Sequence, residues 1–354
     1  MNSFPPEASA FALAQRNFDA IEAEDRDAWY DAFRKASRRA LPWPERFIVE
    51  LANTCNLDCP MCRVGRFGVD LRRIMPLATF ERLACELLSH AREVRLNGLG
   101  ESTLVPEFER YLDVLAQYPV SVELITNGTG PLAIYERMVA DGATLLFSWD
   151  AADPAVFEVL RRPARFAALQ ARAQAVGAYA KRLDRSDNLH LLFTLQSLNV
   201  DQLAPVVELA HAMGFPNVVV NVAKLPSMAW LERVAERAIA EFSNAEQTAR
   251  QLGVRLFLPD RLGSRAIKLA SACRTSASGC DRPWREVVIR WNLDVQACNM
   301  FNPYTYGNLH LRSFHDIWCG AFAAAFRKTL NGPHCHPYCR GCAYVGEVYD
   351  RKNR

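Results

Sequence analysis

The sequence predicts an α/β protein built on a parallel sheet, followed by a small cysteine-rich domain. Short β-branched or apolar runs alternate with amphipathic stretches of helical length up to about residue 258. From about residue 268 to 345 the chain becomes rich in cysteine and turn residues. Strands that alternate with helices indicate βαβ units, whose right-handed crossovers leave few topologies. Six such units are compatible with an incomplete barrel or a doubly wound sheet.

The elements follow in order along the chain. Apolar residues at helix-like spacing predict one or two helices within residues 8–40, which end where prolines occur at Pro42 and Pro44. Strands are expected at 47–51, 94–97, 120–126, 144–149, 189–196 and 218–222. Helices are expected at 77–91, 106–117, 132–141, 154–181, 200–214 and about 229–252. A hairpin at 287–291 and 295–298 and a helix at 314–330 complete the list.

This order suggests three parts. We expect an N-terminal helical extension at residues 1–44, a large α/β domain at 45–260 and a small domain at 268–345. The small domain has too few apolar residues for a large core, so we expect bound metal to hold it together.

The composition excludes several classes of protein. Half of the 354 residues are hydrophobic and 23% are charged, which excludes disorder, collagen and coiled coil. A net charge of +3 gives no electrostatic footprint for nucleic acid. No apolar run reaches the roughly 20 residues that span a bilayer, and the N-terminus does not resemble a signal peptide. We therefore expect a cytoplasmic protein with neither nucleic acid nor membrane as a partner.

The eleven cysteines are unevenly spread. Three lie at Cys55, Cys59 and Cys62, Cys85 stands alone, and seven follow residue 272. In a reducing compartment such clusters are more often metal ligands than disulfides. Cys85, on a predicted helix, is expected to be a small buried hydrophobic residue.

The first cysteine group predicts a site for chemistry. Cys55, Cys59 and Cys62 come directly after the first strand, at the edge of a parallel sheet where active sites assemble. Three thiolates do not complete a tetrahedral zinc site, whereas an iron–sulfur cluster can leave one iron without a protein ligand. The alternative is a loop with free or zinc-binding thiols.

The spacing Cys-x3-Cys-x2-Cys in this position resembles the signature of radical S-adenosylmethionine (radical SAM) enzymes. The resemblance implies a partial (β/α)6 TIM-like barrel in which Cys55, Cys59 and Cys62 hold a [4Fe-4S] cluster and S-adenosylmethionine (SAM) chelates the fourth iron. It also implies that an electron from the cluster cleaves SAM, and that the 5′-deoxyadenosyl radical then takes a hydrogen from the substrate. A flavodoxin- or ferredoxin-type protein would donate the electron.

Later strand ends carry further matches to that family. Gly98-Leu99-Gly100-Glu101 is similar to the Gly-Gly-Glu element that binds the SAM amino group, and Thr126-Asn127-Gly128 is similar to another of its motifs. Glycine allows close backbone approach, and a carboxylate accepts hydrogen bonds from an ammonium group. The resemblance assigns SAM contacts to Met61, Gly98, Gly100, Glu101, Asn127, Ser148, Arg161 and Gln196. Arg162 competes with Arg161 for this role, and a solvated helix face is the alternative for either arginine.

The C-terminal cysteines resemble the SPASM/twitch extension of radical SAM enzymes. Cys280 and Cys298 flank the predicted hairpin, and a Cys-x2-Cys pair, Cys339 and Cys342, lies near the end. The twitch form implies that these four cysteines hold one closed auxiliary [4Fe-4S] cluster, for a total of two clusters, with Cys335 as an alternative ligand. A second auxiliary cluster using Cys273 and Cys319, or a zinc ribbon, are the alternatives.

The resemblance leads to two hypotheses about the reaction. The first is a biosynthetic enzyme that acts on a small sugar-, cyclitol- or nucleoside-like molecule by dehydrogenation, decarboxylation or epimerisation, similar to the 2-deoxy-scyllo-inosamine dehydrogenase type. The second is a maturase that modifies a ribosomal peptide, although only some forty residues precede the barrel. A non-catalytic iron–sulfur or zinc protein is a remote alternative. No residue is assigned as the catalytic base.

Overall fold

The computed structural model describes residues 42–62, 69–223, 229–259, 261–262, 265–266, 280–298, 304–332 and 334–339. The chain divides into two compact units, one formed by residues 50–274 and the other by residues 1–49 together with 275–354. The helices predicted within residues 8–40, and the cysteines Cys273 and Cys342, lie outside the described residues.

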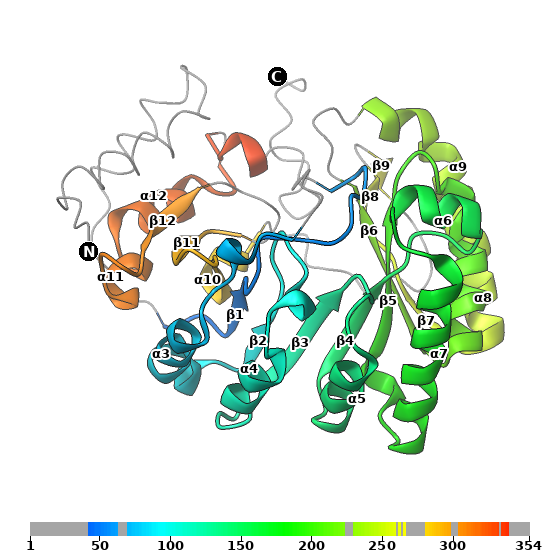
Figure 1. The fold of residues 1–354 in the computed structure, drawn as a ribbon. Helices are drawn as coiled ribbons and strands as arrows, with labels where there is room; N and C mark the ends of the chain where they lie inside the picture. The colour runs from blue at the N-terminus through cyan, green and yellow to red at the C-terminus, as the bar shows by residue number, and fades with distance from the viewer. Residues whose placement is uncertain are drawn as a thin grey trace. The chain divides into compact units, whose positions relative to one another are not determined.

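The described part of residues 50–274 contains six parallel strands that pair in sequence order, as Figure 1 shows. They are β2 (Glu93–Arg95), β3 (Ser121–Thr126), β4 (Thr144–Ser148), β5 (Leu189–Leu195), β6 (Asn217–Val222) and β7 (Arg255–Phe257). A short antiparallel pair, β8 (Arg261–Leu262) and β9 (Arg265–Ala266), follows. Each parallel pairing needs a crossover, so the carboxyl ends of the six strands all lie at one edge.

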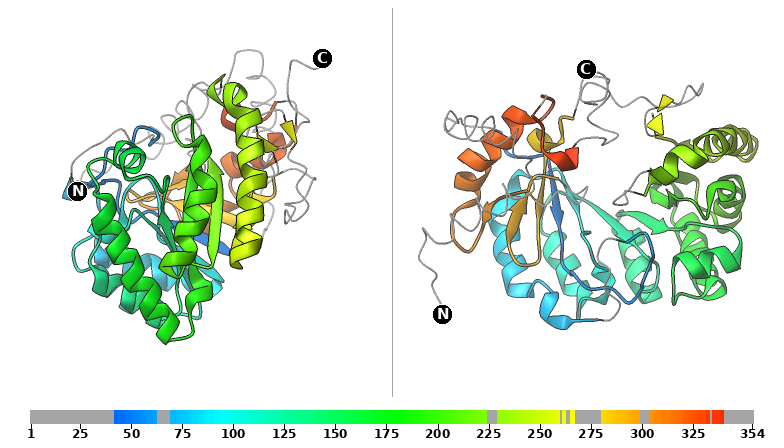
Figure 2. Two further views of the ribbon diagram at one scale, coloured as in Figure 1. Left: turned by 90° about the vertical axis from the view of Figure 1, so that its right-hand side faces the viewer. Right: turned by 90° about the horizontal axis from the view of Figure 1, so that it is seen from above.

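The crossovers are the predicted helices. They are α3 (Leu77–Leu87), α4 (Phe108–Leu115), α5 (Leu132–Ala140), α6 (Pro154–Leu160), α7 (Phe166–Arg182), α8 (Leu203–Met213) and α9 (Ala229–Leu252). The helices α4, α5, α7 and α8 lie along one face of the strands (Figures 1 and 2). Between them, Phe147 of β4 packs against Tyr135 of α5 and against Phe215, with ring centroids 4.9 and 5.5 Å apart. This layer is the hydrophobic core of the unit.

Alternate residues of the same strands point to the opposite, inner face. On β2 and β3 this face carries Arg95, which forms an ion pair with Glu123. On β5 it carries His190 and Thr194, both partly exposed, while the intervening Leu191 and Phe193 are fully buried. The inner face of the unit is therefore markedly more polar than the face under the helices.

The helix predicted at 154–181 is two helices. The chain leaves helical geometry between α6 and α7 because Pro163 has no N–H to donate and disfavours helical geometry in the residue before it. The break leaves Arg161 at the C-terminal end of α6. The helix predicted at 314–330 is likewise divided, into α11 (Phe314–Trp318) and α12 (Ala321–Thr329), with Gly320 between them.

In the described part of the other unit, four strands pair in the order β12-β11-β10-β1. Its strands are β1 (Arg46–Val49), β10 (Glu286–Ile289), β11 (Asp294–Gln296) and β12 (Thr305–Asn308). The predicted hairpin is confirmed as β10 and β11, and β1 pairs with β10 in parallel. Short helices α10 (Arg282–Arg285), α11 and α12 pack with an aromatic core that includes Tyr304, Tyr306, Phe314, Trp318 and Phe326.

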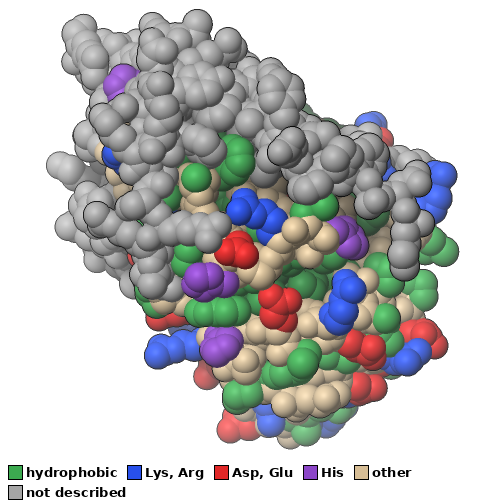
Figure 3. All heavy atoms as spheres, turned by 90° about the vertical axis from the view of Figure 1, so that its left-hand side faces the viewer, with side chains coloured by type: hydrophobic (Ala, Val, Ile, Leu, Met, Phe, Trp, Pro, Cys, Tyr) green, Lys and Arg blue, Asp and Glu red, His purple; other side chains and the backbone are tan. Residues whose placement is uncertain are grey.

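The surface carries mixed charge. On the face drawn in Figure 3, Lys and Arg side chains are interspersed with acidic ones, and histidines are scattered rather than gathered. Within the part of the chain that the structure describes, no helix is both long and apolar enough to cross a membrane.

Candidate functional site

The three cysteines of the first group lie on the loop that starts at Glu50 and leads to the edge where the parallel strands end. The loop is held by backbone bonds: Asn53 N donates to Arg73 O at 2.8 Å, and Met75 N donates to Leu51 O at 2.8 Å. Glu101 N donates to Thr54 O at 2.9 Å. The loop is therefore fixed by the segment that returns before α3 and by the residue that follows the end of β2.

Cys55 is surrounded by donors. The Leu57 amide and the Asn127 Nδ2 donate to its Sγ at 3.4 and 3.6 Å. Burial nevertheless raises the pKa of the Cys55 thiol to about 11, although the Leu57 bond lowers it. N–H donors favour a thiolate, so this sulfur is suited to bind metal, with release of its proton.

Asn127 connects the loop to the end of β3. Its Nδ2 also donates to Asn56 Oδ1 at 3.0 Å, and its Oδ1 accepts from the Thr129 hydroxyl at 2.6 Å. Asn56 in turn donates to Thr129 Oγ1 at 2.9 Å. The sequence singled out Asn127 but not Asn56 or Thr129, because a polar residue in a loop gives no signal of its partners.

Gly98 and Gly100 are close-approach positions. A Cβ on Gly100 would lie 2.4 Å from Ala52 O and 2.5 Å from Thr54 O, both in the backbone of the cysteine loop. A Cβ on Gly98 would lie 2.3 to 2.6 Å from the side chain of Glu50. Glu50 is fully buried and accepts from Leu99 N at 2.7 Å. Both glycines thus allow the end of β2 to pack on the start of the loop.

Glu101 is buried and fully engaged by the protein. Its Oε1 accepts from the hydroxyls of Thr103 and Thr126 at 2.7 and 2.8 Å, and its Oε2 accepts from Asn127 N at 2.6 Å. Burial raises the pKa of this carboxyl, and these bonds lower it. Glu101 therefore ties the end of β2 to the end of β3, while its predicted contact with SAM remains a prediction.

Arg161, Asp150 and Cys59 form a buried electrostatic group. The Arg161 guanidinium, 11% exposed, pairs with the Asp150 carboxylate, which is 0% exposed and follows β4. Burial raises the pKa of the Cys59 thiol, and the charge of Arg161, which also hydrogen-bonds this thiol, lowers it. Burial opposes the charge of Arg161, but Asp150 and the thiolates of Cys59 and Cys62 hold the pKa of Arg161 above its usual value. The structure thus places Arg161, a predicted SAM contact, next to Cys59, a predicted cluster ligand.

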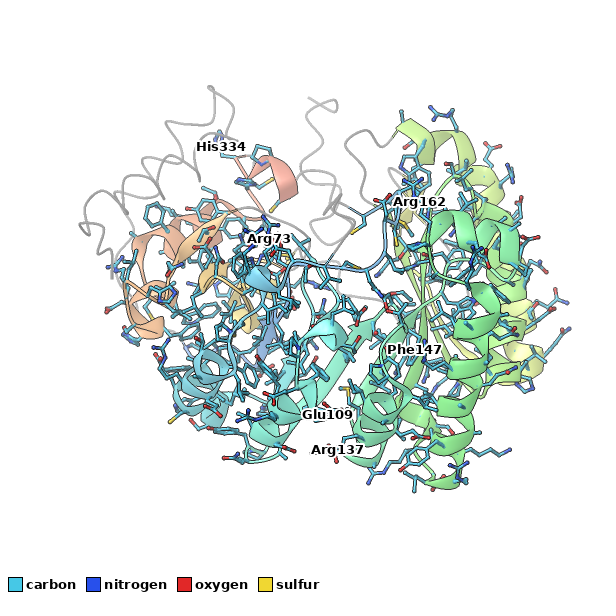
Figure 4. The ribbon with its side chains drawn as sticks, viewed as in Figure 1. Arg73, Glu109, Arg137, Phe147, Arg162 and His334 are labelled. Atoms are coloured by element: carbon cyan, nitrogen blue, oxygen red, sulfur yellow. The ribbon has the colours of Figure 1, made fainter. Side chains whose placement is uncertain are left out.

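Arg162 has a different place. Its Nε donates to Asp58 O at 2.9 Å and its Nη2 pairs with the Asp58 carboxylate at 2.9 Å, with 59% of its side chain exposed. It lies at the strand end reached by the cysteine loop (Figure 4). Arg162 braces the loop from the surface, whereas Arg161 reaches the thiol.

The remaining predicted SAM residues lie near the same edge. Ser148 ends β4 and is 9% exposed, and Met61 is half-buried on the loop. Gln196 follows β5 and is 5% exposed, and its Nε2 has no partner among the described residues. The Oδ1 of Asn97, which follows β2, is likewise buried without a described partner. Sequence reasoning missed Asn97, although it too follows a strand end.

The C-terminal cysteines lie in a buried aromatic setting. Cys280 and Cys339 are 9% and 8% exposed, Cys335 is fully buried and Cys298 is partly exposed. The thiolates of Cys298, Cys339 and Cys280 all lie within electrostatic range of the Tyr306 hydroxyl. Three of the four predicted ligands therefore act electrostatically on the same hydroxyl. Cys342 is outside the described residues.

Two further cysteine results concern the predictions. Cys85 is exposed on α3, so the prediction that it is buried is wrong: its position lies on the solvent side of an amphipathic helix. No three His, Cys, Asp or Glu side chains in the described ranges converge on a point that could hold a single metal ion. The cysteines of a cluster bind different irons and do not need to converge in that way.

Known proteins share both parts of this arrangement. Residues 280–343 match the SPASM family, an iron–sulfur cluster-binding domain. SuiB of Streptococcus suis bound to S-adenosylmethionine superposes with a TM-score of 0.64 at 14% identity, over 92% of this chain and 77% of that one. anSMEcpe with bound AdoMet and Cp18Cys peptide gives 0.60 at 14% identity, over 85% and 87%. No curated protein matches in sequence.

These matches confirm two predictions made from the sequence. At 14% identity the solved structures establish the fold, which is the predicted α/β class with a parallel sheet. The family match establishes the iron–sulfur domain with its β-hairpin at residues 280–343. The chain therefore joins a fold shared with SuiB and anSMEcpe to a C-terminal SPASM domain.

Proposed function

We propose that this protein is a radical SAM enzyme that takes a hydrogen atom from a small biosynthetic molecule, with dehydrogenation as its reaction. One observation carries the proposal: donors from the cysteine loop itself and from two other segments meet its sulfurs. They are the Leu57 amide on the loop itself after β1, Asn127 after β3, and Arg161, which Asp150 holds after β4. Such donors favour thiolates in an anionic cluster.

Cys55, Cys59 and Cys62 would hold a [4Fe-4S] cluster with one iron left for SAM. When both are bound, they supply one-electron cleavage of SAM and a radical able to take hydrogen from an unactivated carbon. The exposure of Cys62, and the partial exposure of Met61, leave this side of the loop open to a ligand.

The chain's own groups would orient SAM. Arg161 lies deep enough to offer its charge to a carboxylate, while Asp150 fixes its direction. Gln196 Nε2 and Asn97 Oδ1 are a donor and an acceptor left buried at strand ends, and such groups need a partner. We assign them to SAM or to the substrate. Ser148 lies at the strand end between them in sheet order.

The C-terminal cysteines would hold a second cluster. Cys280, Cys298, Cys339 and Cys342 would bind it, with Cys335 as the alternative ligand. Four protein ligands leave no iron open, so this group would supply an electron acceptor for a dehydrogenation. A flavodoxin- or ferredoxin-type donor and a cytoplasmic location, where thiols stay reduced, belong to the same proposal.

A ribosomal peptide is the second candidate substrate. SuiB bound to the precursor peptide SuiA shares this fold, with a TM-score of 0.63 at 13% identity. The polar inner face of the barrel, with Arg95 and Glu123 paired on it, favours a small polar molecule instead.

Anaerobic reconstitution tests the proposal. We expect about eight irons per chain, the content of two [4Fe-4S] clusters, and release of 5′-deoxyadenosine from SAM under a strong reductant. Stoichiometric zinc without iron would exclude the proposal. With deuterated candidate substrates, transfer of deuterium into 5′-deoxyadenosine identifies the substrate. Transfer only from a peptide would favour the ribosomal peptide over the small molecule as the substrate.

A further inference from the structure

A tyrosine in the SPASM domain lacks the partner that a buried hydroxyl needs. Tyr306 lies in β12 and is 2% exposed. Nothing in the described residues forms a hydrogen bond with its hydroxyl. The neighbouring Tyr304, fully buried in the same core, does have a partner: its hydroxyl donates to Phe322 O at 3.1 Å. A buried hydroxyl without a partner costs free energy, so the Tyr306 hydroxyl indicates a missing acceptor.

A buried cation lies next to it. Arg327 of α12 is 7% exposed, its Nε donates to Pro283 O at 2.8 Å, and its Nη1 donates to Trp318 O at 2.7 Å. Its Nη2 has no partner among the described residues. The guanidinium lies over the Tyr306 ring, 5.5 Å from the centroid.

The charge of Arg327 is not neutralised by a carboxylate in the described part of the domain. Burial lowers the pKa of Arg327, and among the described residues Tyr306 and Cys319 act to raise it. A buried charge without a counter-charge is strongly unfavourable, and removing a partner typically costs several kcal/mol. The domain therefore contains a buried positive charge and a buried hydroxyl donor, and a nearby anion would satisfy both.

The cysteines show where that anion would lie. The Phe326 ring lies between Tyr306 and the segment that carries Cys339: its centroid is 6.0 Å from that of Tyr306 and 6.3 Å from that of His336, whose carbonyl accepts from Cys339 N at 2.7 Å. Burial raises the pKa of the Tyr306 hydroxyl, Arg327 lowers it, and the thiolates of Cys298, Cys339 and Cys280 raise it. A cluster bound by four thiolates carries net negative charge, which grows by one on reduction. Its reduction potential depends on that charge and on hydrogen bonds to its sulfurs.

We propose that the Tyr306 hydroxyl donates a hydrogen bond to a sulfur of the auxiliary cluster and that Arg327 supplies the positive charge that offsets the cluster's negative charge. The inference rests on the proposed function, because it requires that cluster. Both interactions strengthen when the cluster gains an electron, so both raise its reduction potential. Tyr306 and Arg327 are tuning residues and have no part in hydrogen abstraction.

The test uses the full chain with Cys55, Cys59 and Cys62 all changed to Ala, so that only the auxiliary cluster titrates. Tyr306→Phe removes one oxygen and keeps the ring under Arg327. At a fixed potential we expect the ratio of reduced to oxidised cluster to fall about tenfold, which for one electron is about 59 mV, with unchanged iron content. A redox titration followed by electron paramagnetic resonance measures the ratio.

Tyr304→Phe is the matched control. It removes an equally buried hydroxyl, one that already donates a hydrogen bond to Phe322 O. We therefore expect it to lower stability and to leave the reduction potential of the auxiliary cluster unchanged. Equal potentials for Tyr306→Phe and the parent, or equal shifts for the two tyrosines, would overturn the inference.

Arg327 supplies the second variant if Tyr306→Phe does not retain iron. We expect Arg327→Met to move the potential in the same negative direction and Arg327→Lys, which keeps the charge, to move it less. Parent-like potentials in both would also overturn the inference. A parent chain that binds no auxiliary cluster would instead contradict the proposed function.

Discussion

The two cysteine groups hold their sulfurs in contrasting surroundings. On the first loop Cys62 is exposed, Cys55 and Cys59 are partly buried, and the donors near them include Asn127, after β3, and Arg161, at the end of α6. In the SPASM domain Cys280, Cys335 and Cys339 are buried and Cys298 is partly exposed, and the same domain has a buried aromatic core. The first group therefore presents an exposed sulfur, whereas Cys280, Cys335 and Cys339 of the second are shielded from solvent.

The contrast relates structure to role. A site that must bind SAM and a substrate needs open positions and oriented polar groups, which the strand ends of a parallel sheet supply. A site that only accepts electrons benefits from burial, which sets its potential and protects it. If this holds, substitutions near one cysteine group should leave the iron of the other group unchanged.

Cys55→Ala is expected to have the largest effect. Loss of one of three thiolates should abolish SAM cleavage and leave about four irons per chain, those of the auxiliary cluster. Iron analysis, visible spectra and 5′-deoxyadenosine assay measure this. Cys85→Ala, at an exposed cysteine on α3, is the control. It should retain the full iron content and the activity of the parent chain. If Cys55→Ala still cleaves SAM, the assignment of the catalytic loop is wrong.

The two adjacent arginines separate a buried from a surface role. Arg161→Met leaves the Asp150 carboxylate fully buried and unpaired, so we expect the free energy of unfolding to fall by about 3 kcal/mol. Arg162→Met breaks an ion pair whose arginine is 59% exposed and should cost at most about 1 kcal/mol. Urea unfolding of both variants at one pH measures the difference.

Arg161→Met and Arg162→Met should also differ in how well the first cysteine loop retains iron. Because Arg161 lowers the pKa of the Cys59 thiol, Arg161→Met should also weaken iron retention by the first loop during challenge with a chelator. Iron retention equal to that of Arg162→Met would show that Arg161 acts on stability alone.

Features that depend on local sequence patterns could be predicted. Apolar runs and helical periodicity predict β1 to β6 and the hairpin, because burial of one face imposes those patterns. The spacing of Cys55, Cys59 and Cys62 is likewise local and can be read directly. Which of Arg161 and Arg162 reaches Asp150 depends on where the helix breaks before Pro163.

Other features could not be predicted because they depend on contacts distant in sequence. Glu101 stands in a motif that resembles a SAM contact, yet Thr126 and Asn127, from the next strand, engage its carboxylate. The missing partner of Tyr306 is visible only after β12 has been placed in its core. A sequence gives the residue types at a site, while packing determines which of their atoms remain available.

Gly100→Ala tests whether the end of β2 must pack on the cysteine loop. The added Cβ would meet backbone atoms of Ala52 and Thr54 at 2.4 to 2.6 Å, which cannot move without displacing the loop. We expect a loss of about 2 kcal/mol in unfolding free energy and reduced iron in the first site only. Gly253→Ala is the control: its φ is +69° and nothing lies within 4 Å, so about 1 kcal/mol is expected with iron unchanged. Equal iron contents would mean that the loop tolerates displacement.

The smallest expected effect is a pH dependence that belongs to the barrel unit alone. His190 of β5 is partly buried on the inner face, 6.5 Å from the Phe257 ring, and burial, helped by the charge of Arg255, lowers its pKa to about 4. Above the unfolded pKa of about 6.5, both states are neutral and His190 adds no pH dependence. As the pH falls from 6.5 toward 4, the unfolded chain binds a proton that the folded chain does not, so the free energy of unfolding decreases.

Between pH 7 and pH 5 this loss should be about 1 kcal/mol, because partial exposure of the imidazole reduces the full linkage value. His190→Gln removes the titration and should flatten the difference in urea midpoint between the two pH values, whereas His310→Gln, at an exposed histidine of the other unit, should leave it unchanged. An unaltered difference in His190→Gln would place the acid sensitivity elsewhere. A flattened one would show that the polar inner face of these strands is where the fold is sensitive to acid.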